Sequence, residues 1–144
     1  MSSWLTAFEV GFAVKLILCL VLGVAIGIER ELRNKPAGIS THCFVIGGAC
    51  LFTVVSAIAD PNSPARIAAQ IVSGVGFIGA GMILKSENDS VRNLTTAAAI
   101  WFAAAIGMAI GLGWYAIAVM SSVYAVVVPR IPHIKTWTEG KHDE

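Results

Sequence analysis

Long apolar runs alternate with short polar segments along this chain. Three runs are clearly bounded, at residues 8–28, 40–59 and 66–84. Since roughly 20 apolar residues in an α-helix cross a bilayer core about 30 Å thick, each run predicts a transmembrane helix. The turn sequence Asp60-Pro61-Asn62-Ser63-Pro64 separates the second run from the third.

A fourth apolar stretch, residues 94–128, is too long for one span. Its 35 residues would make a helix of about 52 Å. Gly111-Leu112-Gly113-Trp114 near its middle predicts a tight hairpin, which divides it into helices at 94–111 and 113–128. We therefore expect an all-α integral membrane protein, with about five transmembrane helices in residues 1–128 and a short polar cytoplasmic tail at 129–144.

The cationic residues predict the orientation of these helices. With five spans, one side carries Arg30, Arg33, Lys35, Lys85, Arg92, Arg130, Lys135 and Lys141, whereas the other carries only Arg66, with Lys15 inside the first helix. The positive-inside rule then places the N-terminus outside and the C-terminus in the cytoplasm of a bacterial inner membrane. A four-span arrangement would move the tail's cations across and break this asymmetry.

Composition supports a membrane environment. The 144 residues are 56% hydrophobic and 13% charged, against about 25% charged in a typical soluble domain. The few basic residues lie at the ends of apolar runs rather than in one patch, so we expect lipid and no nucleic acid as partner. Cys19, Cys43 and Cys50 lack C-x-x-C spacing, which favours apolar packing thiols over a disulfide framework or a metal site.

Small residues at helical spacing predict close helix packing, because lipid tails provide no hydrophobic drive for helix association. They are Gly23 and Gly27 on the first helix; Ala69, Ser73, Gly74, Gly76, Gly79, Ala80 and Gly81 on the third; and Thr95, Ala99, Ala103, Gly107 and Gly111 on the fourth. A homodimer interface is the alternative use. Residues 74–79 also match the dinucleotide fingerprint G-x-G-x-x-G, but they lie inside an apolar span with no acidic residue about 20 positions later. We interpret this segment as a thin, partly unwound helix.

Polar residues at one membrane face form a candidate functional cluster, since ionisable groups at membrane depth are costly. Its members are Glu29, Arg30, Lys35, Thr41, His42, Arg92, Asn93, Thr95 and Thr96. Interface anchoring is the alternative for Glu29 and Arg30, and helix capping for Thr41. On the opposite face we expect an Asp60–Arg66 ion pair, a hydrogen bond from Gln70 to a neighbouring helix, and Lys15 snorkelling outward. Neither a catalytic arrangement nor a cofactor site is evident, so we expect no enzyme.

Several blocks of the sequence together resemble the MgtC/SapB family. They are Gly27-Ile28-Glu29-Arg30-Glu31, Lys35-Pro36-Ala37-Gly38 with Thr41-His42, Asp60-Pro61 with residues 66–74, Gly79-Ala80-Gly81, and Val91-Arg92 with residues 94–98. The resemblance covers roughly residues 10–128. Ser40 and Asn93 depart from it, where Arg and Gly are usual. Longer members carry a C-terminal cytoplasmic domain, which we expect this chain to lack.

The resemblance implies an inner-membrane protein linked to magnesium limitation and to virulence. It also implies regulation of other membrane proteins, with the F-type ATP synthase among the partners, and the alternative is a transporter or channel for Mg²⁺ or another ion. Mg²⁺ prefers oxygen ligands, yet the spans contain no carboxylate apart from Glu9 at an outer edge. A pore would then need rings of Asp60 or Glu29 in an oligomer. A redox enzyme using the glycine-rich segment conflicts with the membrane context.

Overall fold

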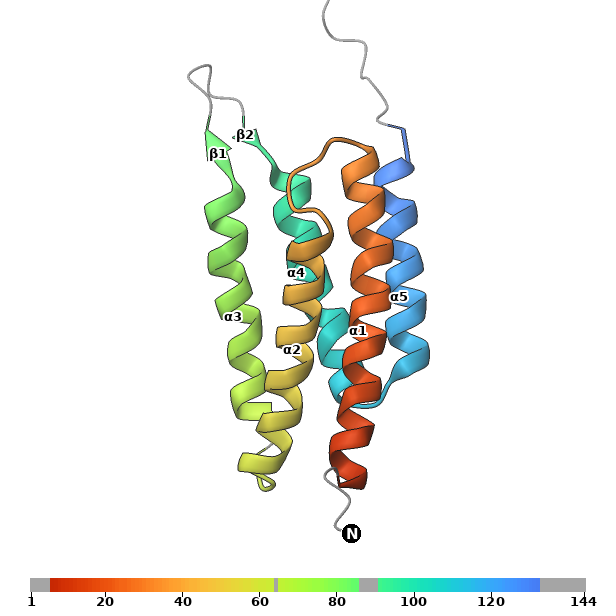
Figure 1. The fold of residues 1–144 in the computed structure, drawn as a ribbon. Helices are drawn as coiled ribbons and strands as arrows, with labels where there is room; N and C mark the ends of the chain where they lie inside the picture. The colour runs from red at the N-terminus through yellow and green to blue at the C-terminus, as the bar shows by residue number, and fades with distance from the viewer. Residues whose placement is uncertain (1–5, 64, 86–90, 133–144) are drawn as a thin grey trace, which may run out of the picture.

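The chain folds into an antiparallel helical bundle, seen in a computed structural model that describes residues 6–63, 65–85 and 91–132 (Figure 1). The helices of this part of the chain are α1 (Ala7–Leu32), α2 (Ile39–Ala59), α3 (Ala65–Met82), α4 (Leu94–Gly111) and α5 (Tyr115–Val127), with the 3₁₀ turn η1 (Val128–Arg130) after α5. Successive helices run in opposite directions (Figure 1). The sequence prediction of a helical bundle is confirmed.

Two ends of the bundle carry different residues. At the basic end lie the last turn of α1, the first turns of α2 and α4, and the ends of α3 and α5 (Figure 1). The described cations of this end are Arg30, Arg33, Lys35, Lys85, Arg92 and Arg130. At the other end, here named the hairpin end, lie the α2–α3 turn and the α4–α5 turn.

The predicted α4–α5 hairpin is confirmed. Helix α4 ends at Gly111 and α5 begins at Tyr115, two residues later than predicted. Gly113 has a φ of 82°, in the left-handed region that glycine adopts without steric cost. The chain can therefore reverse within three residues.

Other predicted boundaries are corrected by the structure. Helix α1 continues beyond residue 28 to Leu32, which places Glu29 and Arg30 on the helix itself. Helix α3 ends at Met82, and the two-residue strands β1 (Leu84–Lys85) and β2 (Val91–Arg92) pair antiparallel after it, with Leu84 opposite Arg92. The all-α expectation therefore misses a short ladder at the basic end.

Close helix packing is present at the glycines of α1 and α4. A Cβ added at Gly23 would lie 2.8 Å from the Cα of Cys43, and one at Gly111 would lie 2.7 Å from the Cβ of Thr53. At Gly27 and Gly107 it would overlap the backbone of Ile39 and of Ile46. Each position brings α2 against a neighbour at a distance that only glycine permits, and Ala103 is likewise buried, at 1% exposure.

The glycines of α3 do not pack as predicted. Added Cβ atoms at Gly74, Gly76 and Gly81 would meet nothing within 4 Å in the described structure, and Gly79 makes ordinary contact with Ala97 at 3.7 Å. The stripe of Ala69, Ser73, Gly76 and Ala80 is exposed. The partly unwound helix is also wrong, because α3 is continuous from Ala65 to Met82. Main-chain hydrogen bonding within the helix satisfies the polar groups that lipid cannot.

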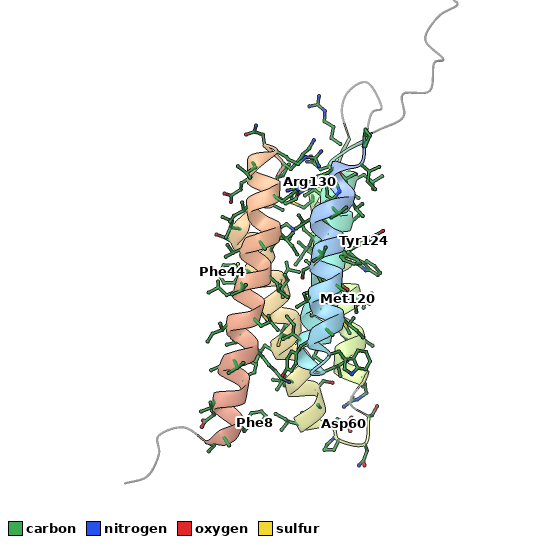
Figure 2. The ribbon with its side chains drawn as sticks, turned by 90° about the vertical axis from the view of Figure 1, so that its right-hand side faces the viewer. Phe8, Phe44, Asp60, Met120, Tyr124 and Arg130 are labelled. Atoms are coloured by element: carbon green, nitrogen blue, oxygen red, sulfur yellow. The ribbon has the colours of Figure 1, made fainter. Side chains whose placement is uncertain are left out.

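The outer surface is apolar, as expected of a membrane protein. Helices α1, α2 and α4 are long and apolar enough to cross a bilayer. Phe44 and Phe77 are 80% and 84% exposed, and Phe8, Phe44, Met120 and Tyr124 project from the bundle (Figure 2). The interior is formed by Ile26, Ile46, Ile106 and Ile110 with the free thiols Cys19 and Cys50. The prediction of apolar packing thiols is confirmed for these two residues.

Candidate functional site

A buried arginine joins three segments at the basic end. Arg30 lies in the last turns of α1 and is 2% exposed. Its Nη2 donates to the hydroxyl of Thr96 in α4 at 2.5 Å and to the carbonyl of Pro36, in the loop before α2, at 3.4 Å. Because a buried charge is costly unless it is hydrogen-bonded, these contacts stabilise the guanidinium where α1, α4 and the loop meet.

Glu29 lies beside Arg30 and is 3% exposed. Its Oε1 accepts a hydrogen bond from Arg33 Nη1 at 3.3 Å, an ion pair one helical turn apart. The same Arg33 nitrogen donates to the carbonyl of Pro129 in η1. The pair therefore fastens the end of α1 to the end of α5.

His42 is fully buried in the second turn of α2. Its Nδ1 lies 3.0 Å from the carbonyl of Gly38, so Nδ1 is the ring donor in this contact. Among the described residues, Glu29 Oε2, Arg30 Nε and His42 Nε2 are the buried side-chain atoms without a hydrogen-bond partner. Unpaired buried polar atoms are costly, and all three occur at the basic end.

The remaining residues of the predicted cluster lie at the same end of the bundle. Lys35 and Thr95 are exposed and line a cavity together with Arg30. Arg92 is exposed and lies in β2, whereas Thr41 is half-buried in α2. The alternative of Thr41 as a helix cap is wrong, because α2 begins at Ile39 and its first N–H donates to the carboxylate of Glu31 at 2.9 Å.

Asn93 precedes α4 in a left-handed conformation, with a φ of 63° and a ψ of 15°. Glycine adopts this conformation freely, and asparagine is among the few other residues that tolerate it. The backbone therefore accounts for the difference at this position, where the resembling family usually has glycine.

The cavity at the basic end has a volume of about 350 Å³. Three cations line it, together with small and aromatic residues of α4 and α5. The lining residues are Arg30, Arg33, Lys35, Thr95, Ala98, Ala99, Phe102, Tyr124, Ala125, Val128, Pro129 and Ile131. Its chemistry suits an anion with an apolar portion.

A second cavity, of about 510 Å³, lies between α2 and α3. We name it the α2–α3 groove, and its lining residues are Phe44, Val45, Gly48, Ala49, Phe52, Gln70, Ile71, Gly74, Val75 and Ile78. Gln70 is exposed there. Its predicted hydrogen bond to a neighbouring helix is absent from the described part of the chain.

The hairpin end contains the predicted ion pair. Arg66 Nη2 and Asp60 Oδ2 are 3.1 Å apart, with Arg66 72% exposed. Lys15 does not simply extend outward, because its ammonium group donates to the carbonyl of Gly111 at 2.6 Å. A cation at the C-terminus of a helix stabilises the exposed carbonyls there, so Lys15 supports the end of α4.

Several residues that make contacts at the basic end were not predicted from the sequence. Spacing of four residues between Glu29 and Arg33 on a helix could have identified their ion pair. Two other contacts depend on the tertiary arrangement. The carboxylate of Glu31 accepts a hydrogen bond from the N–H of Ile39, and the rings of Phe102 and Tyr124 pack with their centroids 5.5 Å apart. No local pattern indicates them. Within the described ranges, no group of three His, Cys, Asp or Glu residues is placed to hold a metal ion.

Comparisons with known proteins identify the family. The profile of the MgtC family matches residues 16–133. The chain is 46% identical over 135 residues to the Escherichia coli protein named "Putative magnesium transporter YhiD", covering 88% of this chain and 62% of that protein. It is 43% identical over 122 residues to Protein SapB of Bacillus subtilis, covering 78% and 53%. It is 44% identical over 112 residues to Protein MgtC of Salmonella typhimurium, covering 78% and 48%.

The chain thus spans about half to three-fifths of the length of these relatives. No solved structure matches it. The family profile covers most of the chain, and the polar cluster predicted from the sequence falls within it. This protein belongs to the MgtC family.

Proposed function

We propose that this chain regulates another membrane protein by packing its α2–α3 groove against a helix of that partner. All five helices would cross the bacterial inner membrane, with the N-terminus outside and the basic end in the cytoplasm. Helix α3 has 18 residues, about 27 Å, and so nearly spans a bilayer core of about 30 Å. The cations of the basic end support this orientation.

The proposal rests on glycines of α2 and α3 that have open space where a side chain would be. Added Cβ atoms at Gly47, Gly48, Gly74, Gly76 and Gly81 would meet nothing within 4 Å in the described structure. Glycine weakens a helix by about 1 kcal/mol relative to alanine, and inside this bundle nothing at these positions requires it. In lipid, an outward glycine permits close approach of another helix. A partner helix could therefore pack closely against these glycines, which make no such contact within the bundle.

The family suggests what the regulation serves. Relatives are named a putative magnesium transporter and MgtC, and the sequence resemblance implies a response to magnesium limitation and a role in virulence. We therefore propose a function in magnesium homeostasis. On the same resemblance, the F-type ATP synthase is the first partner to test.

The experiment is a mild-detergent pull-down of the tagged protein from native membranes, read by mass spectrometry. Gly48→Leu and Gly74→Leu would fill the groove without disturbing the bundle, because both positions are open. Gly11→Leu is the matched control, since Gly11 of α1 is equally open and lies outside the groove. We expect the partner to be lost only with the two groove variants, at equal amounts of inserted protein. A partner retained by all three variants would refute the proposed interface.

A transporter is the second candidate, favoured by the buried and unpartnered Glu29 Oε2 and by the name of the relative YhiD. An oxygen atom of this kind is a suitable Mg²⁺ ligand, although Arg30 and Arg33 lie next to it. Recovery of the protein alone would make transport the leading function. Mg²⁺ flux into proteoliposomes that falls with Glu29→Gln would then establish it.

A further inference from the structure

We propose that the cavity at the basic end binds the phosphate headgroup of an anionic phospholipid, with the lipid chains leaving along α4 and α5. This inference rests on residues of α1, the α1–α2 loop, α4 and α5, whereas the proposed regulatory contact uses the α2–α3 groove. The two can therefore be tested separately.

The charge of the cavity is the first argument. Arg30, Arg33 and Lys35 line it, and no carboxylate is among its lining residues. The two carboxylates nearest along the chain each hold one partner: Glu29 accepts from Arg33 through Oε1, and Glu31 accepts from the N–H of Ile39. Arg33 is therefore paired with Glu29, and the excess positive charge of the lining comes from Arg30 and Lys35.

Arg30 is held ready to bind an anion. Thr96 and Pro36 hold its Nη2, while its Nε has no partner among the described residues. Guanidinium groups bind phosphate through paired N–H donors. A phosphate in the cavity would lie beside this guanidinium, and its negative charge would stabilise the buried cation.

Below the cations the cavity is apolar. Helix α4 descends from the basic end, so Ala98 and Ala99 follow Thr95 and Phe102 comes one turn deeper. Phe102 contacts Tyr124 of α5. Small side chains thus leave space between the cations and an aromatic floor, an arrangement that matches a headgroup followed by acyl carbons. Basic pockets between transmembrane helices on the cytoplasmic side bind phospholipid headgroups in this way.

The same features select the type of lipid. A zwitterionic headgroup would bring an ammonium group among three cations, with no lining carboxylate to receive it. A free phosphate ion would leave the apolar wall unused. The chemistry therefore favours an anionic phospholipid over both.

The test is native mass spectrometry of the full chain in detergent, titrated with dioleoyl phosphatidylglycerol or dioleoyl phosphatidylethanolamine. Lys35→Gln removes an exposed lining cation, and Arg92→Gln is its control, an exposed cation of the same end outside the lining. Ala98→Phe fills the cavity, and Ala105→Phe is its control, exposed on the same helix.

We expect phosphatidylglycerol to bind more tightly than phosphatidylethanolamine. Lys35→Gln should weaken the binding of phosphatidylglycerol about fivefold, which corresponds to the loss of about 1 kcal/mol for one cation near a membrane surface. Arg92→Gln should leave the binding of phosphatidylglycerol unchanged. Ala98→Phe should abolish binding while Ala105→Phe retains it. Equal binding of both lipids, or equal effects of a variant and its control, would overturn the assignment. Displacement of the lipid by millimolar inorganic phosphate would show a site for a soluble anion and would also overturn it.

Discussion

A methyl group added at Gly107 would overlap the backbone of α2. The new Cβ would contact the carbonyl oxygen of Ile46 and lie 2.8 Å from the Cβ of Ala49. Neither obstacle can rotate away, because one is main chain and the other is a methyl group fixed to it. Gly107→Ala must therefore push α4 away from α2 along the most buried part of the bundle.

The magnitude follows from two opposing effects. Overfilling a well-packed core costs typically about 1–3 kcal/mol, and the backbone obstacle places Gly107 toward the upper value. Replacing a helical glycine by alanine gains about 1 kcal/mol. We expect a net loss of about 2 kcal/mol for Gly107→Ala. Gly74→Ala is the matched control, since its Cβ would meet nothing within 4 Å of the described structure, and it should keep the gain.

Thermal unfolding in detergent, followed with a thiol-reactive dye, measures this difference. Cys19 and Cys50 are 1% and 0% exposed and become reactive only when the bundle opens. The midpoint should fall for Gly107→Ala and stay level or rise for Gly74→Ala. Equal midpoints for the two variants would refute the argument that glycine sets the α2–α4 distance.

Two further changes test the basic end with the same assay. Thr96→Val removes the hydroxyl that accepts from Arg30 and should cost about 2 kcal/mol, since a buried charged donor loses its partner; Thr95→Val, at an exposed position, is the control and should be neutral. Asn93→Ala should cost about 1 kcal/mol and Asn93→Gly should cost nothing, because of the positive φ at this residue. An alanine variant as stable as the glycine variant would contradict the stated role of the left-handed backbone.

The positions of the helices could be predicted because local signals determine them. Apolar runs of membrane length predicted α1, α2 and α3, and the glycines at 111 and 113 predicted the break before α5. The Asp60–Arg66 ion pair was also predictable, since a short turn keeps its two residues close together. These features depend only on neighbours in the chain.

Which face of each helix packs into the interior of the bundle could not be predicted in this way. The small-residue stripes of α3 and α4 both recur every three or four residues, as one face of a helix does. Yet Gly107 meets the backbone of α2, whereas Gly76 meets nothing within 4 Å in the described structure. The contact of Lys15 with Gly111 likewise joins residues that lie 96 positions apart. Only the packing of the whole bundle decides which of two similar faces becomes the interior.

The interior of a single copy bears on the choice between regulation and transport. A cation crossing the bundle needs oxygen ligands at successive depths, but the described core clusters are formed by Ile, Leu, Val, Ala and Cys. Among the buried hydroxyls, those of Thr53 and Ser122 donate to carbonyls of their own helices, and that of Thr96 accepts from Arg30. Transport would therefore need a path between copies, for which the α2–α3 groove is the open face. In a transporter of this kind, Gly48→Leu would abolish both self-association and ion flux. In a regulator, Gly48→Leu would instead abolish binding of the partner protein, and the unsubstituted protein would show no ion flux.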